Sequence, residues 1–191
     1  LLWLIGLTNA FNFMDGLDLM VVAGIAVPHG LLALLALTGG APAVISAAVA
    51  GAVFGFAPYN VPPARVFLGD SGSLAIGYLT GAVVLLIARD YPIAAFLPFL
   101  YFIADSTSVL LFRMARSENV LVAHSCHAYQ LARRAGRSSA SVATRVAILS
   151  VFCTLAAAAA ILSQSTMIVA LSLAVSLAAT AGLIVRMRGV C

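Results

Sequence analysis

A polar, glycine-rich turn, GDSGS, opens directly into an apolar stretch at residues 69–73. The pattern predicts a helix N-terminus, where free backbone N–H groups suit a phosphate group. Asp70 would repel that phosphate unless a divalent cation lay between them, and Mg²⁺ prefers one or two carboxylates together with phosphate oxygens and water. Asp70 is therefore a candidate Mg²⁺ ligand beside a diphosphate, with Mn²⁺ as a substitute ion. The alternative is a plain helix cap made by Asp70, Ser71 or Ser73.

A second polar cluster lies in the stretch NAFNFMDGLD. Asn12, Asp15 and Asp18 follow one another at intervals of three residues, so on a helix their side chains would form one polar edge. Two carboxylates this close repel each other and need solvent, a cation or a shared proton. Gly16 lets the backbone break or come close to a ligand. The cluster predicts either a ligand-facing edge or a solvated helix end, and Asn9 is expected to serve helix packing.

A third polar stretch, HSCHAYQLARR, contains two histidines and a basic end. His124 and His127 are three residues apart and could share a helix face, but this spacing alone is weak evidence for zinc. Arg133, Arg134 and Arg137 follow closely. The stretch predicts either an anion-binding surface or a basic surface that meets anionic lipid headgroups.

One acid, Asp105, lies inside the apolar stretch YFIADSTSVLLF. An ionisable group inside a membrane span is a functional candidate by default. The structural alternative is a hydrogen bond to Ser106, to Thr107 or to a facing helix. His29, which follows Pro28 in another apolar stretch, is expected to be structural.

The elements that carry these residues are apolar enough to lie in a membrane. The chain has 191 residues, of which 63% are hydrophobic and only 8% are charged, whereas a soluble domain carries roughly 25% charged residues. This composition excludes an ordinary soluble domain and predicts an all-α fold, a polytopic membrane helix bundle. Because Leu1 lies inside an apolar run, we expect a single transmembrane catalytic domain over residues 1–191 that lacks its N-terminal helices.

Seven apolar segments are predicted to be transmembrane helices, the first of them partial. They cover residues 1–13, 19–37, 43–57, 73–88, 92–112, 142–163 and 166–185. Pro28 and Pro98 are expected to kink their spans, which membrane helices tolerate. Two pairs of glycines have the GxxxG spacing that allows close helix packing, Gly51 with Gly55 and Gly77 with Gly81.

Strict alternation of these spans places the connecting segments on two sides. Eight arginines fall on the first side: Arg65, Arg113, Arg116, Arg133, Arg134, Arg137, Arg186 and Arg188. Only Arg89 falls on the other side, and this bias makes the first side cytoplasmic. The three polar stretches lie on that same side. They are therefore expected to converge on one membrane face, where a water-soluble substrate can arrive.

The stretches NAFNFMDGLD, YNVPPARVFLGDSGSLAIG and HSCHAYQLARRAG, in this order and spacing, resemble the polyprenyl-phosphate N-acetylhexosamine-1-phosphate transferase family, also catalogued as glycosyltransferase family 4. The resemblance covers residues 3–137. It implies Mg²⁺-dependent transfer of a sugar-1-phosphate from a UDP-sugar to undecaprenyl phosphate, with release of UMP. It also implies a multi-pass protein of the bacterial inner membrane whose active site faces the cytoplasm.

The resemblance assigns the metal and the catalytic groups to acids and histidines. Asp70 looks like the Mg²⁺ ligand, and Asp15 and Asp18 look like part of the polar edge near the nucleotide and the diphosphate. His124 and His127 occupy the position of the family's histidine-motif loop, which helps to bind the diphosphate or the sugar.

Four further residues resemble substrate contacts. Asn12 belongs to the same polar edge, and Gly69 opens the turn that meets the substrate. Phe67 is similar to the aromatic residue that stacks on uracil, and Asn60 is similar to a polar neighbour of that pocket.

Two features depart from the family pattern. The pair of adjacent aspartates expected upstream, which is the family's proposed base or nucleophile, is absent, so a direct attack and a covalent intermediate both stay open. The histidine motif reads HSCH instead of a run of consecutive histidines. The letters HAYQ resemble the O-antigen-type branch, which acts on GlcNAc or on a 6-deoxy-N-acetylhexosamine.

Two other readings stay open beside the transferase. One is an ion-coupled transporter that uses Asp15, Asp18, Asp70 and Asp105, although transporters usually bind near the bilayer midplane and often contain internal repeats. The other is an inactive fragment of the transferase. The expected partners are a UDP-sugar donor, undecaprenyl phosphate and the lipid bilayer, with no nucleic acid and with a homodimer left open.

Overall fold

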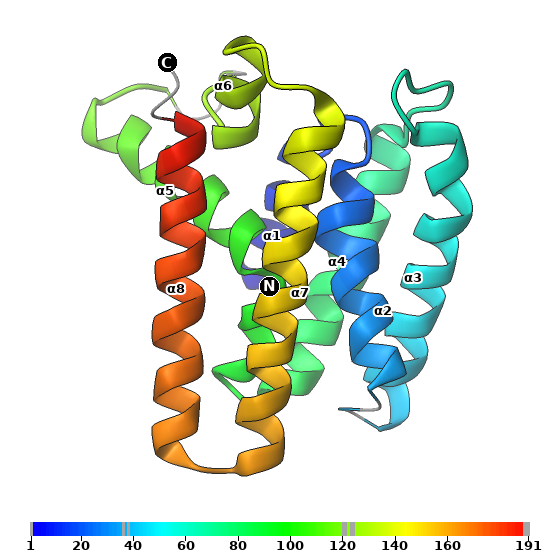
Figure 1. Cartoon of the computed structure of the whole chain (residues 1–191), viewed down its shortest axis with the longest axis vertical. Helices are drawn as coiled ribbons and strands as arrows, with labels where there is room; N and C mark the ends of the chain where they lie inside the picture. Colours follow the sequence, from blue (N-terminus) through cyan, green and yellow to red (C-terminus); the bar gives the residue numbers. More distant parts are fainter. Residues whose placement is uncertain (1, 36, 38, 120–121, 123–124, 189–191) are drawn as a thin grey trace.

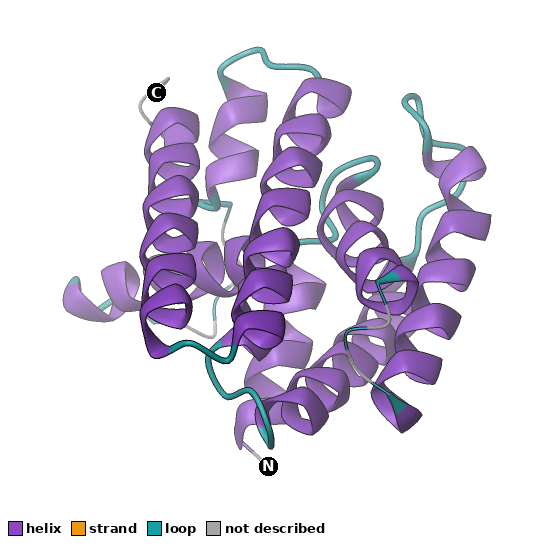
Figure 2. Cartoon of the chain, turned by 60° about the horizontal axis from the view of Figure 1, so that its bottom comes forward, coloured by secondary structure: helices purple, strands orange, loops and turns teal. Residues whose placement is uncertain are grey.

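The structure is a computed structural model that describes the chain except residues 1, 36, 38, 120–121, 123–124 and 189–191. Figure 2 shows that the regular elements of the described part are helices, without strands. In chain order they are α1 (Leu2–Phe13), η1 (Val22–Ala26), α2 (Val27–Leu34), α3 (Gly40–Asn60), α4 (Gly69–Ala88), η2 (Ala94–Phe99), α5 (Leu100–Ala115), α6 (Ala128–Arg134), α7 (Ser139–Ser163) and α8 (Thr166–Arg188). The predicted all-α fold is confirmed.

Within the described residues, five helices are long and apolar enough to cross a membrane. They are α3, α4, the continuous stretch Ala94–Ala115, α7 and α8. The predicted segments 1–13 and 19–37 also form helices, but α1 has 12 residues and the apolar helix Val22–Leu34 is similarly short. At 1.5 Å per residue, such helices are shorter than the roughly 30 Å hydrocarbon layer. The chain is a multi-pass membrane protein, with five of the seven predicted spans long enough to cross.

The two prolines expected to kink their spans lie where α-helical geometry changes. Pro28 occupies the first turn of α2, directly after the π-helical segment η1. Pro98 lies inside the 3₁₀ segment η2, directly before α5. Proline cannot donate a backbone hydrogen bond, so the helical ladder is interrupted at these points. By contrast, α3 runs from Gly40 to Asn60 and extends past both ends of the predicted segment 43–57.

One of the two glycine pairs makes the close packing that was predicted. A Cβ atom on Gly77 would lie 3.0 Å from the Cα atom of Thr8, and one on Gly81 would lie 3.1 Å from the side chain of Leu4. The helices α1 and α4 are therefore in near backbone contact. The prediction is wrong for the pair in α3, Gly51 and Gly55, because no described atom of a neighbouring helix lies within 4 Å of a Cβ atom built on either glycine.

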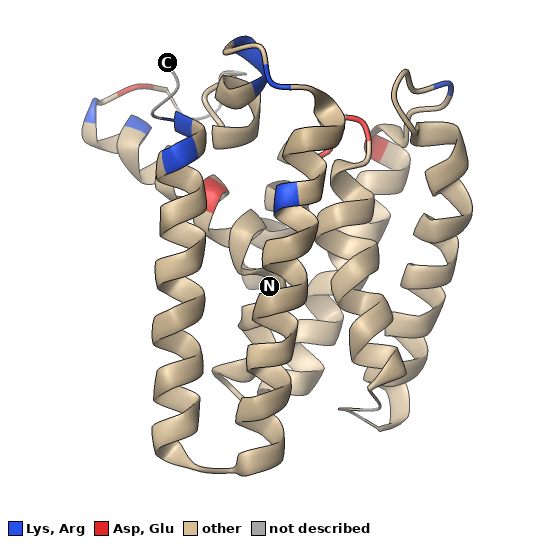
Figure 3. Ribbon diagram, in the orientation of Figure 1, with Lys and Arg blue, Asp and Glu red and all other residues tan. Residues whose placement is uncertain are grey.

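The connections alternate between two ends of the bundle, as the spans predicted. Figure 1 shows the turn after α1, the loop between α3 and α4, the segment around α6 and the end of α8 at one end. The arginines drawn in Figure 3 gather there, and we name this the arginine-rich end. At the opposite end, Arg89 and Asp90 line a cavity with Gln164 and Thr166 from the turn between α7 and α8.

The buried His29 ties three helices together in the opposite half of the bundle. Its Nδ1 atom lies 3.1 Å from Ser46 Oγ of α3, and its Nε2 atom lies 3.0 Å from Thr80 Oγ1 of α4. Thr80 donates its own proton to the carbonyl oxygen of Ile76, so its hydroxyl oxygen accepts from His29 Nε2–H. The predicted structural role of His29 is confirmed.

Candidate active site

Asn12 joins the first two polar stretches at the arginine-rich end. It lies in the last turn of α1, and Asp70 lies in the first turn of α4. The Nδ2 atom of Asn12 donates to Asp70 Oδ1 and to Ser73 Oγ, both at 3.1 Å. These bonds form because the glycines of α4 let α1 pack closely against it. A donor on one motif therefore orients the carboxylate of the other.

Asp15 and Asp70 form a pair of like charges. Burial, together with the charge of the nearby Asp70 carboxylate, raises the pKa of Asp15 to about 6. Asp15 is half-buried, whereas Asp70 is exposed. Two carboxylates that repel each other, one of them open to solvent, form a suitable place for a divalent cation.

The polar edge itself does not have the helical form that was predicted. The helix α1 ends at Phe13, so Asp15 and Asp18 lie in the turn that follows it. The backbone N–H of Asp15 donates to the carbonyl oxygen of Asn12 at 3.1 Å, which is a tighter turn than an α-helix. Because the chain turns here, Asp15 and Asp18 do not continue the α1 helix as the predicted polar edge required.

The helix α4 begins without the side-chain cap that was the alternative reading of GDSGS. Its N-cap residue is Leu68, which makes no side-chain capping hydrogen bond. Gly69 has a φ of +64°, a left-handed conformation that favours glycine. Asp70 is left in the first turn, near the exposed N–H groups of the helix end.

Asn60 braces the loop that carries Phe67. Its Oδ1 atom accepts from the backbone N–H of Leu19 at 2.7 Å, and its Nδ2 atom donates to the carbonyl oxygen of Val66 at 3.0 Å. Asn60 is buried, while Phe67 is 74% exposed at the arginine-rich end. Asn60 thus lies beneath the loop and holds it through the Val66 carbonyl group. The uracil-stacking role of Phe67 stays a prediction.

His127 lies at the N-cap of α6, and His124 lies outside the described residues. The His127 side chain is buried, with its ring centroid 6.2 Å from that of Phe13 and 6.0 Å from that of Tyr129. Its backbone N–H donates to Gln130 Oε1 at 3.1 Å. His127 therefore packs against the end of α1. Asn12, Asp15, Asp70 and Ser73, which we name the Asn12 cluster, lie at the same end of the bundle.

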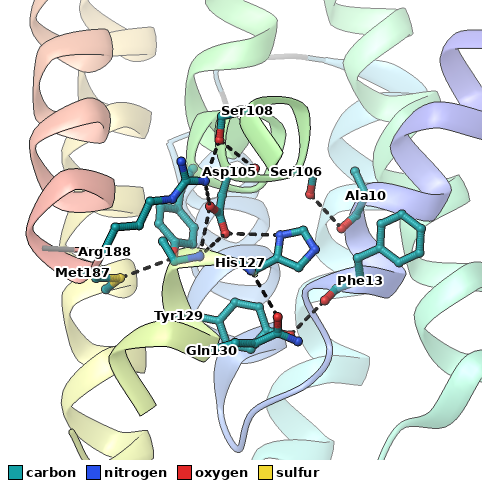
Figure 4. Close-up of polar contacts among 12 residues, drawn as sticks. Ala10, Phe13, Asp105, Ser106, Ser108, His127, Tyr129, Gln130, Met187 and Arg188 are labelled. Atoms are coloured by element: carbon teal, nitrogen blue, oxygen red, sulfur yellow. Dashed lines mark hydrogen bonds and ion pairs between the residues drawn. The ribbon is translucent and has the colours of Figure 1, made fainter. Parts of the chain in front are cut away.

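Asp105 of α5 contacts His127 and Ala128 of the histidine stretch, as Figure 4 shows for His127. It is fully buried, and its two carboxylate oxygens accept from the backbone N–H of Ala128 at 3.1 and 3.0 Å. Oδ2 also lies 3.4 Å from His127 Nδ1, and Oδ1 accepts from Arg188 Nη2 at 3.0 Å. The structural alternative for Asp105 is confirmed. Its partners are α6 and α8, while the neighbouring Ser106 hydroxyl donates to the carbonyl oxygen of Ala10.

Tyr129 is a site residue that the sequence did not single out. Its hydroxyl donates to the carbonyl oxygen of Phe13 at 2.9 Å, and burial together with the Asp105 charge raises the pKa of this phenol. A Cβ atom on Gly16 would lie only 2.3 Å from the Tyr129 hydroxyl oxygen. The predicted close approach at Gly16 therefore exists, but its partner is Tyr129. The one feature of the sequence that pointed to Tyr129 was its position as an aromatic residue two places after His127.

Two cavities flank the histidine stretch. The first, of about 380 Å³, has Asp18 and Gly16 on one wall and Arg133 and Arg134 of α6 on the other. The second, also about 380 Å³, is mainly apolar and lies between α1 and α5, with His127 in its wall. Asn9 is exposed and lines this second cavity, so the prediction that Asn9 serves helix packing is wrong.

A divalent cation fits the donor set of the Asn12 cluster. Among the described residues, no group of three or more His, Cys, Asp or Glu side chains could hold a metal ion. Magnesium does not need such a cage, because it usually takes one or two carboxylates and completes its shell with substrate phosphates and water. Asp70 and Asp15 would supply that number of carboxylates.

Comparison with known proteins identifies the family from the part of the chain that carries the Asn12 cluster. A family model described as Glycosyl transferase family 4 matches residues 1–88. A phospho-N-acetylmuramoyl-pentapeptide-transferase of Shouchella clausii is 42% identical over 87 residues, which are 44% of this chain and 27% of the relative. A probable undecaprenyl-phosphate N-acetylglucosaminyl 1-phosphate transferase of Bacillus subtilis is 39% identical over 87 residues, which are 44% of this chain and 24% of the relative.

A longer match includes more of the chain. A phospho-N-acetylmuramoyl-pentapeptide-transferase of Lacticaseibacillus paracasei is 34% identical over 113 residues, which are 58% of this chain and 35% of the relative. The matched segment therefore spans about a quarter to a third of the length of these relatives. The family model ends at residue 88, before the histidine stretch, whose catalytic role stays a prediction. Residues 1–88, which contain both NAFNFMDGLD and GDSGS, match glycosyl transferase family 4.

Proposed function

We propose that this chain carries the active site of an enzyme that transfers an N-acetylhexosamine-1-phosphate from a UDP-sugar to undecaprenyl phosphate and releases UMP. The observation that carries the proposal is the pair of hydrogen bonds from Asn12 to Asp70 and Ser73. These bonds join the stretches NAFNFMDGLD and GDSGS at the end of the bundle where the histidine stretch also lies. The relatives, whose names describe phospho-sugar transfer, support the same reaction class.

Asp70 and Asp15 would hold Mg²⁺, or Mn²⁺ in its place. When bound, the ion would supply positive charge that orients the diphosphate and stabilises the departing UMP. Phosphoryl transfer depends mainly on positioning and charge neutralisation. In this proposal Asn12 orients the Asp70 carboxylate, Phe67 stacks on the uracil and Gly69 lets the backbone approach the substrate. The arginines of the cavity that contains Asp18 supply further positive charge near the diphosphate.

The acceptor would reach the site from the bilayer. The apolar cavity between α1 and α5 has His127 in its wall, so it connects an apolar surface with the polar end of the bundle. A polyprenyl chain could lie in this cavity while its phosphate meets the diphosphate near His127. The geometry suits a reaction between a lipid-soluble acceptor and a water-soluble donor.

The arginine-rich end would face the cytoplasm of a bacterium, and the protein would lie in the inner membrane. The positive-inside bias supports this orientation, with eight arginines assigned to that side and Arg89 to the other. UDP-sugars are cytoplasmic metabolites, so the donor would arrive on that side. A homodimer is compatible with this arrangement.

For the donor, we propose GlcNAc or a 6-deoxy-N-acetylhexosamine, in a pathway that starts an O-antigen-like polysaccharide. The stretch HSCHAYQ supports this choice, since it differs from a run of consecutive histidines. The second candidate donor is a UDP-linked muramoyl pentapeptide. It is favoured by the names of the Shouchella and Lacticaseibacillus relatives, which describe transfer of a phospho-N-acetylmuramoyl pentapeptide.

A lipid-extraction assay tests the reaction and separates the donors. The full-length membrane protein is incubated with undecaprenyl phosphate, Mg²⁺ and one radiolabelled donor at a time: UDP-GlcNAc, a UDP-6-deoxy-N-acetylhexosamine or the UDP-muramoyl pentapeptide. We expect a labelled lipid and release of UMP with an N-acetylhexosamine donor. A labelled lipid from the muramoyl pentapeptide alone would select the second donor. No lipid product from any donor would reject the transferase and leave the transporter or an inactive protein.

A further inference from the structure

The last turn of α8 binds α5 at two consecutive residues. Arg188 Nη2 donates to Asp105 Oδ1 at 3.0 Å and to Ser108 Oγ at 2.8 Å. Met187 Sδ accepts from the hydroxyl of Tyr101 at 3.4 Å. Figure 4 shows the Arg188 side chain reaching Asp105, with Met187 next to it on the same helix. The C-terminal helix therefore makes specific polar contacts at the site, in addition to its apolar contacts along the bundle.

Asp105 needs the cation that Arg188 provides. Its carboxylate is fully buried, and a buried charge is costly unless it is paired and hydrogen-bonded. The Arg188 side chain is 32% exposed, so its guanidinium is partly shielded from water while it contacts Asp105. Removal of Arg188 would leave the buried carboxylate with the Ala128 amide and His127 as its partners from α6.

Asp105 in turn holds residues 127–128 of the histidine stretch. The Ala128 amide that it accepts belongs to the residue directly after His127, and the His127 ring lies against the same carboxylate. The Ala128 amide and the His127 ring are thus held by one carboxylate. Hydrogen bonds to a charged acceptor are stronger than neutral ones, so this group sets the orientation of the loop.

We propose that Arg188 is a positioning residue for the histidine stretch. It holds the Asp105 carboxylate in the orientation that fixes His127 and Ala128, so the C-terminal helix controls the geometry of the active site. The inference rests on the proposed function only for its activity measurement. Its structural part, the link from Arg188 through Asp105 to Ala128, can be tested without any substrate.

Hydrogen exchange measures the link directly. The full-length protein is compared with Arg188→Met and with Arg186→Met, a matched control two residues earlier whose side chain is exposed. We expect amide exchange in the peptide over residues 126–134 to become roughly tenfold faster in Arg188→Met, the effect of losing a hydrogen bond to a charged group. Exchange in Arg186→Met should match wild type. Unchanged exchange in Arg188→Met, or an equal change in both variants, would overturn the proposal.

Kinetics then test whether the position of the stretch matters for turnover. We expect kcat of Arg188→Met to fall by roughly 10²-fold, because a small misplacement of a reacting group can cost that much. The KM for the UDP-sugar should change much less than kcat, and Arg188→Lys should recover part of the rate because it keeps the charge. A loss in Arg188→Met that Lys does not reduce, or that appears in KM alone, would argue against positioning.

A double variant shows whether the two residues act as one unit. If Arg188 acts through Asp105, then Asp105→Asn combined with Arg188→Met should lose no more kcat than the worse single variant. Additive losses would contradict the proposal. If the wild-type protein makes no lipid product, the proposed function fails, while the exchange experiment still decides whether Arg188 orders the histidine stretch.

Discussion

At the residue scale, the site depends on how one amide orients one carboxylate. Asn12 donates to both Asp70 and Ser73, so the Asp70 carboxylate is held in one orientation although its side chain is exposed. Asp15 approaches from the turn after α1, and burial followed by the charge of Asp70 raises its pKa. A pair of this kind is poorly stabilised by the protein alone. A cation that binds both acids would remove the repulsion, which is why the metal prediction concentrates on Asp70.

The substitution Asp70→Asn tests that prediction. We expect turnover to fall by roughly 10²-fold or more, because the charge that holds the metal is lost and metal stabilisation of the transition state is worth several kcal/mol. Since Asp70 is exposed, the thermal midpoint should stay close to wild type. The transfer assay at increasing Mg²⁺ measures the effect, with Asp90→Asn at the opposite end as the control. A wild-type rate and Mg²⁺ dependence in Asp70→Asn would show that the metal assignment is wrong.

The contact between Gly16 and Tyr129 gives a second prediction at this scale. Gly16→Ala places a Cβ atom 2.3 Å from the Tyr129 hydroxyl oxygen, so we expect a loss of about 1–3 kcal/mol in stability, as for an overpacked core. Tyr129→Phe removes that oxygen and should relieve part of the clash. The double variant is then expected to melt at a higher temperature than Gly16→Ala alone. Gly182→Ala, which has open space around it, is the control for thermal unfolding in detergent. Equal melting of the double variant and Gly16→Ala would rule out this clash.

At the scale of the elements, hydropathy predicted where the helices lie but not which side chains meet. Apolar runs locate each helix because the membrane requires every backbone group to be paired within it. The helix α1 ends at Phe13, as the segment 1–13 predicted, whereas α3 extends past both ends of the predicted segment 43–57. The contact of Arg188 with Asp105 joins residues 83 positions apart, and only the packing of α8 on α5 brings them together. No local pattern in the sequence carries that information.

The glycine pairs show the same limit and give a prediction for the elements. The GxxxG spacing is equal in α3 and α4, yet only Gly77 and Gly81 face a neighbouring described helix. Gly77→Ala would place a methyl group 3.0 Å from the backbone of Thr8, which cannot rotate away. We expect it to separate α1 from α4, to cost about 1–3 kcal/mol and to lower transfer activity, because the link from Asn12 to Asp70 spans these helices. Gly51→Ala should change neither the thermal midpoint nor the activity; equal effects of the two variants would refute the packing argument.

At the scale of the whole molecule, the fold gathers three distant stretches at one end. The turn after α1, the start of α4 and the described part of the histidine stretch at α6 all lie at the arginine-rich end (Figures 1 and 3). The alternation of helices makes this possible, because each pair of crossings returns the chain to the same side. A soluble donor and a membrane-bound acceptor can meet only at such an interface. Sidedness therefore decides whether the proposed reaction is feasible.

Thiol labelling in whole cells tests the sidedness. Cys126 is exposed at the arginine-rich end, and Asp90 is exposed at the opposite end. In a background with Cys126 and Cys191 replaced by serine, Asp90→Cys should react with a membrane-impermeant maleimide added outside, because the proposed orientation puts that end in the periplasm. In a matched protein that keeps Cys126 and lacks the new cysteine, labelling should require permeabilised cells. Cys153 is buried and serves as the internal background. Labelling of Cys126 from outside intact cells would invert the topology, and a cytoplasmic donor could then not reach Asp70.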